Sequence, residues 1–168
     1  MRLRRREIIA YICDRIEGLY SAEEARTLAR MAAAELSGED VMRYLIEPNE
    51  EIEIDGLESR AGDLAAGRPI QYIVGHTEFC GEEFAVREGA LIPRPETEEL
   101  LCWIAKSTPR GATILDVGTG SGCIAIALSR EVADAKVYGL DISTEALAVA
   151  RRNGQRYAPS VTFIEGDA

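Results

Sequence analysis

The sequence of 168 residues lacks the features that would place it in several protein classes. No segment approaches the roughly 18 consecutive apolar residues that a membrane-spanning helix needs, so we expect no membrane association. The chain has one histidine, and its four cysteines contain no Cys-x-x-Cys pair, so neither a metal site nor a disulfide scaffold is predicted. The four scattered cysteines are expected to be small, buried or half-buried thiols.

A secretory signal is also not predicted at the start of the chain. Arginines at positions 2, 4, 5 and 6 resemble a basic leader, but the apolar stretch 8–13 is short and is followed by Asp14 and Arg15. We therefore expect a cytoplasmic location.

Negative charge is in excess and is unevenly distributed. The formal net charge is −10. Residues 1–85 carry 10 Arg or Lys and 18 Asp or Glu, a net charge of −8, whereas residues 86–168 carry 9 and 11, a net charge of −2. An acidic surface disfavours direct nucleic-acid binding. It would suit a basic protein partner, but from charge alone a solvated surface that aids solubility is the favoured explanation.

The first part of the chain has the periodicity of helices. Apolar residues at helical spacing predict helices over about 3–17, from the capping box Ser21–Glu24 to Gly38, over 41–46 and over 51–66. Residues 71–74 are predicted to be extended, and 77–80 and 82–86 to form a β-hairpin around Gly81. We expect a helical domain over residues 1–69, a hairpin linker over 70–95 and a second domain over 96–168.

The second domain alternates strand and helix patterns. Strands are predicted over 113–117, 136–140 and 161–165, and helices over 121–130 and 143–153, with a further helix opened by Pro95. This β-α-β-α-β order predicts an α/β fold with a parallel sheet, in which ligands bind at the carboxyl ends of the strands.

The most informative motif lies at that edge of the expected sheet. Asp116 and Val117 end the first strand, and the glycine-rich run 118–122 leads directly into a helix. Glycines there allow positive φ and close approach of a ligand to the backbone. Asp141 ends the second strand, where an acid can accept both hydroxyls of a ribose. Together these residues predict a nucleoside-binding site.

The glycine spacing indicates which nucleoside is bound. Nicotinamide dinucleotide sites favour Gly-x-Gly-x-x-Gly, whereas the third glycine here comes one residue earlier, at Gly122. The pattern resembles the first motif of S-adenosylmethionine-dependent methyltransferases, so a nicotinamide oxidoreductase is disfavoured.

Taken together, the motifs resemble those of the protein-(glutamine) methyltransferases that modify peptide-chain release factors. The stretches that carry the resemblance are 67–72, 79–84, 91–98 (Leu-Ile-Pro-Arg-Pro-Glu-Thr-Glu), 114–122, Asp141 and 166–167. The resemblance implies a helical domain joined through a hairpin to a Rossmann-like methyltransferase domain, with S-adenosylmethionine as cofactor and a release factor as partner. The cofactor-binding residues it implies are Gly118, Thr119, Gly120, Ser121, Gly122, Asp141, Asp167 and Ala168. Arg94 and Thr97, on either side of Pro95, would lie near the substrate.

One family signature is absent from the sequence. The Asn-Pro-Pro-Tyr motif that would orient the glutamine amide does not occur, so no catalytic residue is assigned. We expect the chain to contain the first half of the methyltransferase sheet and to be inactive in isolation. Two alternatives remain: a methyltransferase for a glutamine of a large-subunit ribosomal protein, and a non-catalytic fragment that binds a release factor.

Overall fold

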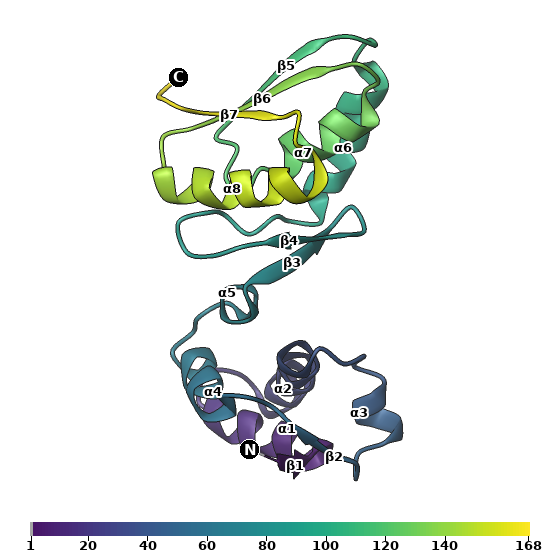
Figure 1. The fold of residues 1–168 in the computed structure, drawn as a ribbon. Coiled ribbons are helices and arrows are strands. Elements are labelled where there is room, and N and C mark those ends of the chain that lie inside the picture. Colours follow the sequence, from purple (N-terminus) through teal and green to yellow (C-terminus); the bar gives the residue numbers. More distant parts are fainter. Residues whose placement is uncertain (1) are drawn as a thin grey trace. The chain divides into compact units, whose positions relative to one another are not determined.

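The computed structural model describes residues 2–168, which divide into two compact units, one ending at Val74 and the other covering Gly75–Ala168 (Figure 1). The first unit contains β1 (Arg2–Arg4), α1 (Arg5–Ile16), α2 (Ala22–Ser37), α3 (Arg43–Ile46), β2 (Glu51–Glu53), α4 (Leu57–Ala65) and α5 (Ile70–Val74). The second contains β3 (His76–Phe79), β4 (Glu82–Ala85), α6 (Glu96–Ser107), β5 (Thr113–Val117), α7 (Cys123–Glu131), β6 (Lys136–Asp141), α8 (Thr144–Tyr157) and β7 (Thr162–Glu165). None of the helices formed by residues 2–168 has the length and apolar character required to cross a membrane.

The core of the first unit forms where α1 packs on α2. Ile8, Ile12 and Ile16 recur every four residues on one face of α1 and are buried. They pack in one cluster with the small alanines of α2, which allow the two helices to approach closely. The predicted capping box is present, since Ser21 Oγ accepts from the Glu24 amide and the Glu24 carboxylate accepts from the Ser21 amide.

Two predictions for this unit were wrong. Residues 51–66 do not form one helix, because Glu51–Glu53 pair antiparallel with Arg2–Arg4 and α4 begins only at Leu57. The alternation of Glu and Ile at 51–54 has the period of a strand, and Gly56, with φ of 63°, separates it from the helix. Residues 71–74 are helical and not extended, because the Pro69 carbonyl accepts from the amides of Tyr72 and Ile73.

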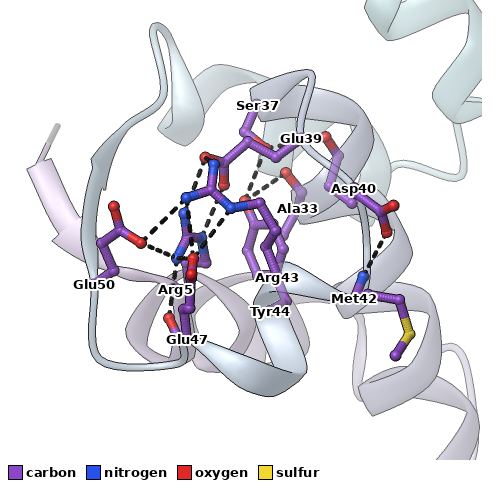
Figure 2. A network of polar contacts seen from close by, with 11 residues as sticks. Arg5, Ala33, Ser37, Glu39, Asp40, Met42, Arg43, Tyr44, Glu47 and Glu50 are labelled. Atoms are coloured by element: carbon purple, nitrogen blue, oxygen red, sulfur yellow. Dashed lines mark hydrogen bonds and ion pairs between the residues drawn. The ribbon is translucent and has the colours of Figure 1, made fainter.

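A buried arginine fixes the segment that carries α3 (Figure 2). The Arg5 side chain is fully buried, and its guanidinium donates two hydrogen bonds to the Glu39 carboxylate, at 2.8 and 3.0 Å. It also donates to the carboxylates of Glu47 and Glu50, at 3.1 and 2.7 Å. Arg43, which is partly exposed, pairs with the same three carboxylates. The fork geometry of the guanidinium satisfies the buried charge and ties residues 39–50 to the start of α1.

In the second unit, the predicted β-hairpin is present as β3 and β4. Its two-residue turn, Cys80–Gly81, has positive φ at both positions, 51° and 73°, as a type I′ turn requires. Phe79 and Phe84 from the two strands are buried, with their rings edge to face at 6.0 Å. Both belong to the same hydrophobic cluster as α7.

The predicted parallel sheet is also present, in the order β5-β6-β7. Figure 1 shows α7 and α8 on the same side of this sheet. On that side Val137 and Gly139 are buried, while Leu115, Val117 and Ile164 on the other side are exposed. β5 and β7 are the two edge strands among the described residues.

The ring of Phe163 lies close to three glycines behind the glycine-rich loop. A Cβ added to Gly139 or Gly154 would come within 2.7 Å of this ring, and one added to Gly122 within 3.1 Å. A side chain at these positions would therefore displace the aromatic ring that supports the loop.

Candidate cofactor-binding site

The glycine-rich loop connects β5 to α7 and has a left-handed backbone at three positions. Gly118, Gly120 and Gly122 have φ values of 73°, 55° and 80°, a region that other residues enter only at a cost. Gly122 lies at the start of α7. The prediction of a glycine-dependent turn at 118–122 is therefore confirmed by the backbone itself.

Most backbone amides of this loop already donate hydrogen bonds to other groups of the protein. Those of Gly118 and Thr119 both donate to the Leu140 carbonyl, at 2.8 and 2.9 Å, and that of Gly122 donates to the Thr119 carbonyl. The Gly120 amide donates to Asp141 Oδ2 at 2.8 Å. A pyrophosphate-binding loop offers such amides to its ligand. This loop is thus better suited to a nucleoside without a pyrophosphate.

Asp141 is held in a fixed orientation at the end of β6. Its Oδ2 accepts from the Gly120 amide, and its Oδ1 accepts from the Ser143 amide at 2.9 Å. Each carboxylate oxygen has a further lone pair, so both can still accept a hydroxyl. The geometry fits the predicted role of binding two ribose hydroxyls, because the backbone fixes the carboxylate before a ligand arrives.

Asp116 supports the loop from the half-buried end of β5. Its Oδ2 accepts from the Thr119 hydroxyl at 2.7 Å. Burial raises the pKa of Asp116, the Thr119 and Ala125 hydrogen bonds partly offset this rise, and the charge of Asp141 adds to it. Thr119 and Ser121 are buried, so their side chains contribute to the packing beneath the loop.

The residues after β7 lie beside Asp141. The Gly166 amide donates to the Asp141 carbonyl at 3.0 Å, which brings the start of the segment 166–168 to the same edge of the sheet. Asp167 and Ala168 are exposed there, and the Ala168 amide donates to Asp167 Oδ1.

The segment containing Arg94 begins next to the glycine-rich loop. A Cβ added to Gly120 would come within 3.9 Å of the Leu91 amide nitrogen. From Leu91 the chain continues through Arg94 to Thr97. Arg94 is exposed and Thr97 is half-buried. The Thr97 amide donates to the Arg94 carbonyl in the first turn of α6. Leu91 is adjacent to the loop, and the roles of Arg94 and Thr97 remain predictions.

Sequence reasoning missed one residue of the site, Asn153 on α8. Its side chain is only 2% exposed and makes three hydrogen bonds to backbone groups. Oδ1 accepts from the Ala85 amide at 2.9 Å, and Nδ2 donates to the carbonyls of Ala85 and Ser121, at 3.0 and 2.9 Å. Asn153 therefore connects β4 to the glycine-rich loop. The sequence signal that could have indicated this role is an asparagine on the apolar face of an otherwise amphipathic helical pattern.

Comparison with known proteins agrees with this geometry. Residues 114–168 match the family described as a methyltransferase domain. A release factor glutamine methyltransferase from Bacteroides thetaiotaomicron is 41% identical over 166 residues, which is 95% of this chain and 59% of that protein. One from Flavobacterium psychrophilum is 50% identical over 107 residues, which is 61% of this chain and 38% of that protein.

Among solved structures, a precorrin-6y C5,15-methyltransferase from Geobacter metallireducens aligns with 49% of this chain and 44% of its own, with 23% identity and a TM-score of 0.44.

The family matches have three consequences. The chain spans about three fifths of the length of the first of these relatives. The predicted α/β methyltransferase fold is confirmed, and S-adenosylmethionine is the cofactor that the matches indicate. The chain is therefore similar over nearly its whole length to a release factor glutamine methyltransferase, and its residues 114–168 match a methyltransferase domain.

Proposed function

We propose that this protein methylates a glutamine side-chain amide of peptide-chain release factors, with S-adenosylmethionine as methyl donor, and that residues 1–168 supply the cofactor site. The observation that carries the proposal is the extent of the similarity to the Bacteroides thetaiotaomicron enzyme, which covers 95% of the chain. A match confined to residues 114–168 would support methyl transfer in general. One that extends through the first unit also supports the release factor as substrate.

The site residues fit this cofactor. Asp141, fixed by the amides of Gly120 and Ser143, would accept the ribose hydroxyls. The glycines of 118–122 leave room for the methionine part close to the backbone, and Asp167 and Ala168 would lie beside the adenine. When bound, S-adenosylmethionine supplies an electrophilic methyl group on a sulfonium.

Transfer to an amide depends mainly on orientation. The amide nitrogen is a weak nucleophile because its lone pair is delocalised into the carbonyl, so it must be held with that lone pair directed at the methyl group. Arg94 and Thr97 are our candidates for contacts near the substrate, since their segment starts beside the glycine-rich loop. The sequence contains no Asn-Pro-Pro-Tyr motif to hold the amide, so we expect the 168 residues alone to bind the cofactor without transferring its methyl group.

The release factor is proposed to dock on residues 1–85, which comprise the helical unit and the β3–β4 hairpin. Residues 1–85 carry a net charge of −8, which would attract a basic surface and accelerate association at low ionic strength. If this charge guides docking, the association rate falls as salt is added. An unchanged rate between low and high salt would leave the acidic surface with a role in solubility alone.

A transfer assay with labelled S-adenosylmethionine tests the proposed function. The product of the complete reading frame is incubated with a release factor, a large-subunit ribosomal protein, and a release factor whose target glutamine is replaced by asparagine. We expect label only in the unaltered release factor. Label in the ribosomal protein instead would assign the enzyme to the other glutamine methyltransferases, and transfer by residues 1–168 alone at a similar rate would show that the absent motif is unnecessary.

A further inference from the structure

Two cysteines of the second unit lie at its surface, on elements that contact each other. Cys80 is the first residue of the β3–β4 turn, and Cys102 lies on α6. Both are free and exposed, contrary to the expectation of buried or half-buried thiols, whereas Cys13 is half-buried and Cys123 is buried. These two thiols are therefore the ones most accessible to a reagent in solution.

A hydrogen bond places the turn against the face of α6 that carries Cys102. The Cys80 amide donates to Glu98 Oε1 at 2.8 Å. Glu98 and Cys102 are four residues apart on α6, so they lie one above the other on the same face of the helix. The contact between Cys80 and Glu98 therefore places the β3–β4 turn beside the helical face that carries Cys102.

The surroundings of Cys80 agree with this placement. Partial desolvation of this exposed thiol and the charge of Glu98 raise its pKa; Cys102 and Glu131 raise it further, and Arg130 lowers it. Cys102 is thus among the groups near enough to act electrostatically on Cys80. The raised pKa lowers the reactivity of the Cys80 thiol at neutral pH, because the thiolate is the nucleophile.

The backbone of the turn does not account for a cysteine at position 80. A type I′ turn favours asparagine, aspartate or glycine at a position with positive φ, and Cys80 has φ of 51°. Its side chain is exposed, so it does not contribute a buried contact either. Neither turn geometry nor packing therefore explains the cysteine, which leaves the chemistry of its thiol as the property that distinguishes residue 80.

We propose that Cys80 and Cys102 form a redox-active dithiol, which a low-molecular-weight disulfide such as oxidised glutathione converts to a disulfide that joins the β3–β4 turn to α6. The Cys102 thiolate attacks one sulfur of the small disulfide and expels one small thiolate. The Cys80 thiolate then attacks the Cys102 sulfur of the mixed disulfide and expels the second. The protein loses two electrons and two protons, and the small disulfide is reduced to two thiols.

The bond would restrain α6 directly after the segment that contains Arg94. It closes a covalent loop around residues 81–101. This loop includes β4, the segment at Leu91 that lies beside the glycine-rich loop, and the first part of α6. Cross-linking these positions reduces the entropy of the unfolded chain, so the oxidised form is expected to unfold at a higher temperature.

Peptide mapping of the 168-residue chain tests the proposal. The chain is incubated with oxidised glutathione, its remaining thiols are blocked with iodoacetamide, and it is digested with trypsin. Because trypsin does not cleave before Pro69 and Pro95, Cys80 lies in peptide 61–87 and Cys102 in peptide 88–106. We expect these two peptides to be joined, at a rate independent of protein concentration and higher at higher pH, with Cys13 and Cys123 unpaired.

Two serine variants and a fluorescence signal complete the test. Cys80→Ser and Cys102→Ser change exposed side chains, so both should fold, and both should yield only mixed disulfides with glutathione. Trp103, the single tryptophan, adjoins Cys102, and we expect its fluorescence to fall on oxidation and to recover with dithiothreitol in the unaltered chain alone. Mixed disulfides at both cysteines without a cross-link, or pairing of Cys13 as often as Cys102 with Cys80, would overturn the proposal.

Discussion

Replacing Asn153 should destabilise the second unit, because its side chain connects two backbone segments that are distant in the sequence. Asn153→Ala removes one acceptor and two donors and leaves the Ala85 amide and the carbonyls of Ala85 and Ser121 without these partners. An unsatisfied buried polar group costs about 1–3 kcal/mol. Ala85 is only half-buried and water can partly replace its lost bonds, so we expect a total loss of about 3 kcal/mol.

Two further variants separate the hydrogen bonds from the loss of volume. Asn153→Asp keeps the shape and one acceptor but places a carboxylate oxygen against the carbonyls of Ala85 and Ser121, so its loss should equal or exceed that of the alanine variant. Gln155→Ala removes an exposed amide from the same helix and should change the free energy of unfolding by less than about 0.5 kcal/mol.

Urea unfolding followed by circular dichroism measures these differences. The three variants and the unaltered chain are compared at neutral pH under identical conditions. A loss below about 1 kcal/mol for Asn153→Ala, or an Asn153→Asp variant as stable as the unaltered chain, would refute the view that Asn153 holds the glycine-rich loop.

Three further predictions concern the cores of the two units. Arg5→Ala should lower the free energy of unfolding of the first unit by about 3 kcal/mol or more, because it leaves Glu39 without its buried partner. Arg43→Ala loses only partly exposed ion pairs and should cost less than about 1 kcal/mol. Equal losses in urea unfolding would contradict this prediction. The Arg5 hydrogen bond lowers the pKa of Glu39 in the folded state, so its stabilising contribution is present above the ordinary value of 4.5 and is lost as the pH falls through the folded-state pKa. Unfolding measured from pH 6 to 3 should therefore show a smaller slope in Arg5→Ala than in the unaltered chain. Gly139→Ala should destabilise the second unit by about 1–3 kcal/mol because its Cβ would overlap Phe163, and a thermal midpoint unchanged from that of the unaltered chain would exclude this overlap.

The sequence was most informative where local chemistry decides the structure. The strand at 113–117, the turn at 118–122 and the helix that follows could be predicted because the apolar residues and the glycines are consecutive. The position of Asp141 at the end of β6 follows from the β-α-β order in the same way, since parallel strands bring their carboxyl ends to one edge.

Contacts between distant residues could not be predicted. Asn153 bonds to Ala85, 68 residues away, and nothing near either residue indicates the other. Arg5 belongs to a run of arginines that resembles a solvated end of the chain. Its side chain is nevertheless buried, and it donates to Glu39, 34 residues later. The strand pairing of Arg2–Arg4 with Glu51–Glu53 was missed for the same reason, because each segment alone is too short to identify.

The central claim is that the loop 118–122 and Asp141 bind S-adenosylmethionine and not a dinucleotide. Isothermal titration calorimetry of the 168-residue chain with S-adenosylhomocysteine and with NAD tests it most directly, with Asp141→Asn as the matched variant. We predict binding of S-adenosylhomocysteine, weakened at least about tenfold in Asp141→Asn because a charged acceptor of the ribose hydroxyls is lost, and no binding of NAD. Binding of NAD without binding of S-adenosylhomocysteine, or equal affinity of the variant and the unaltered chain, would contradict the account.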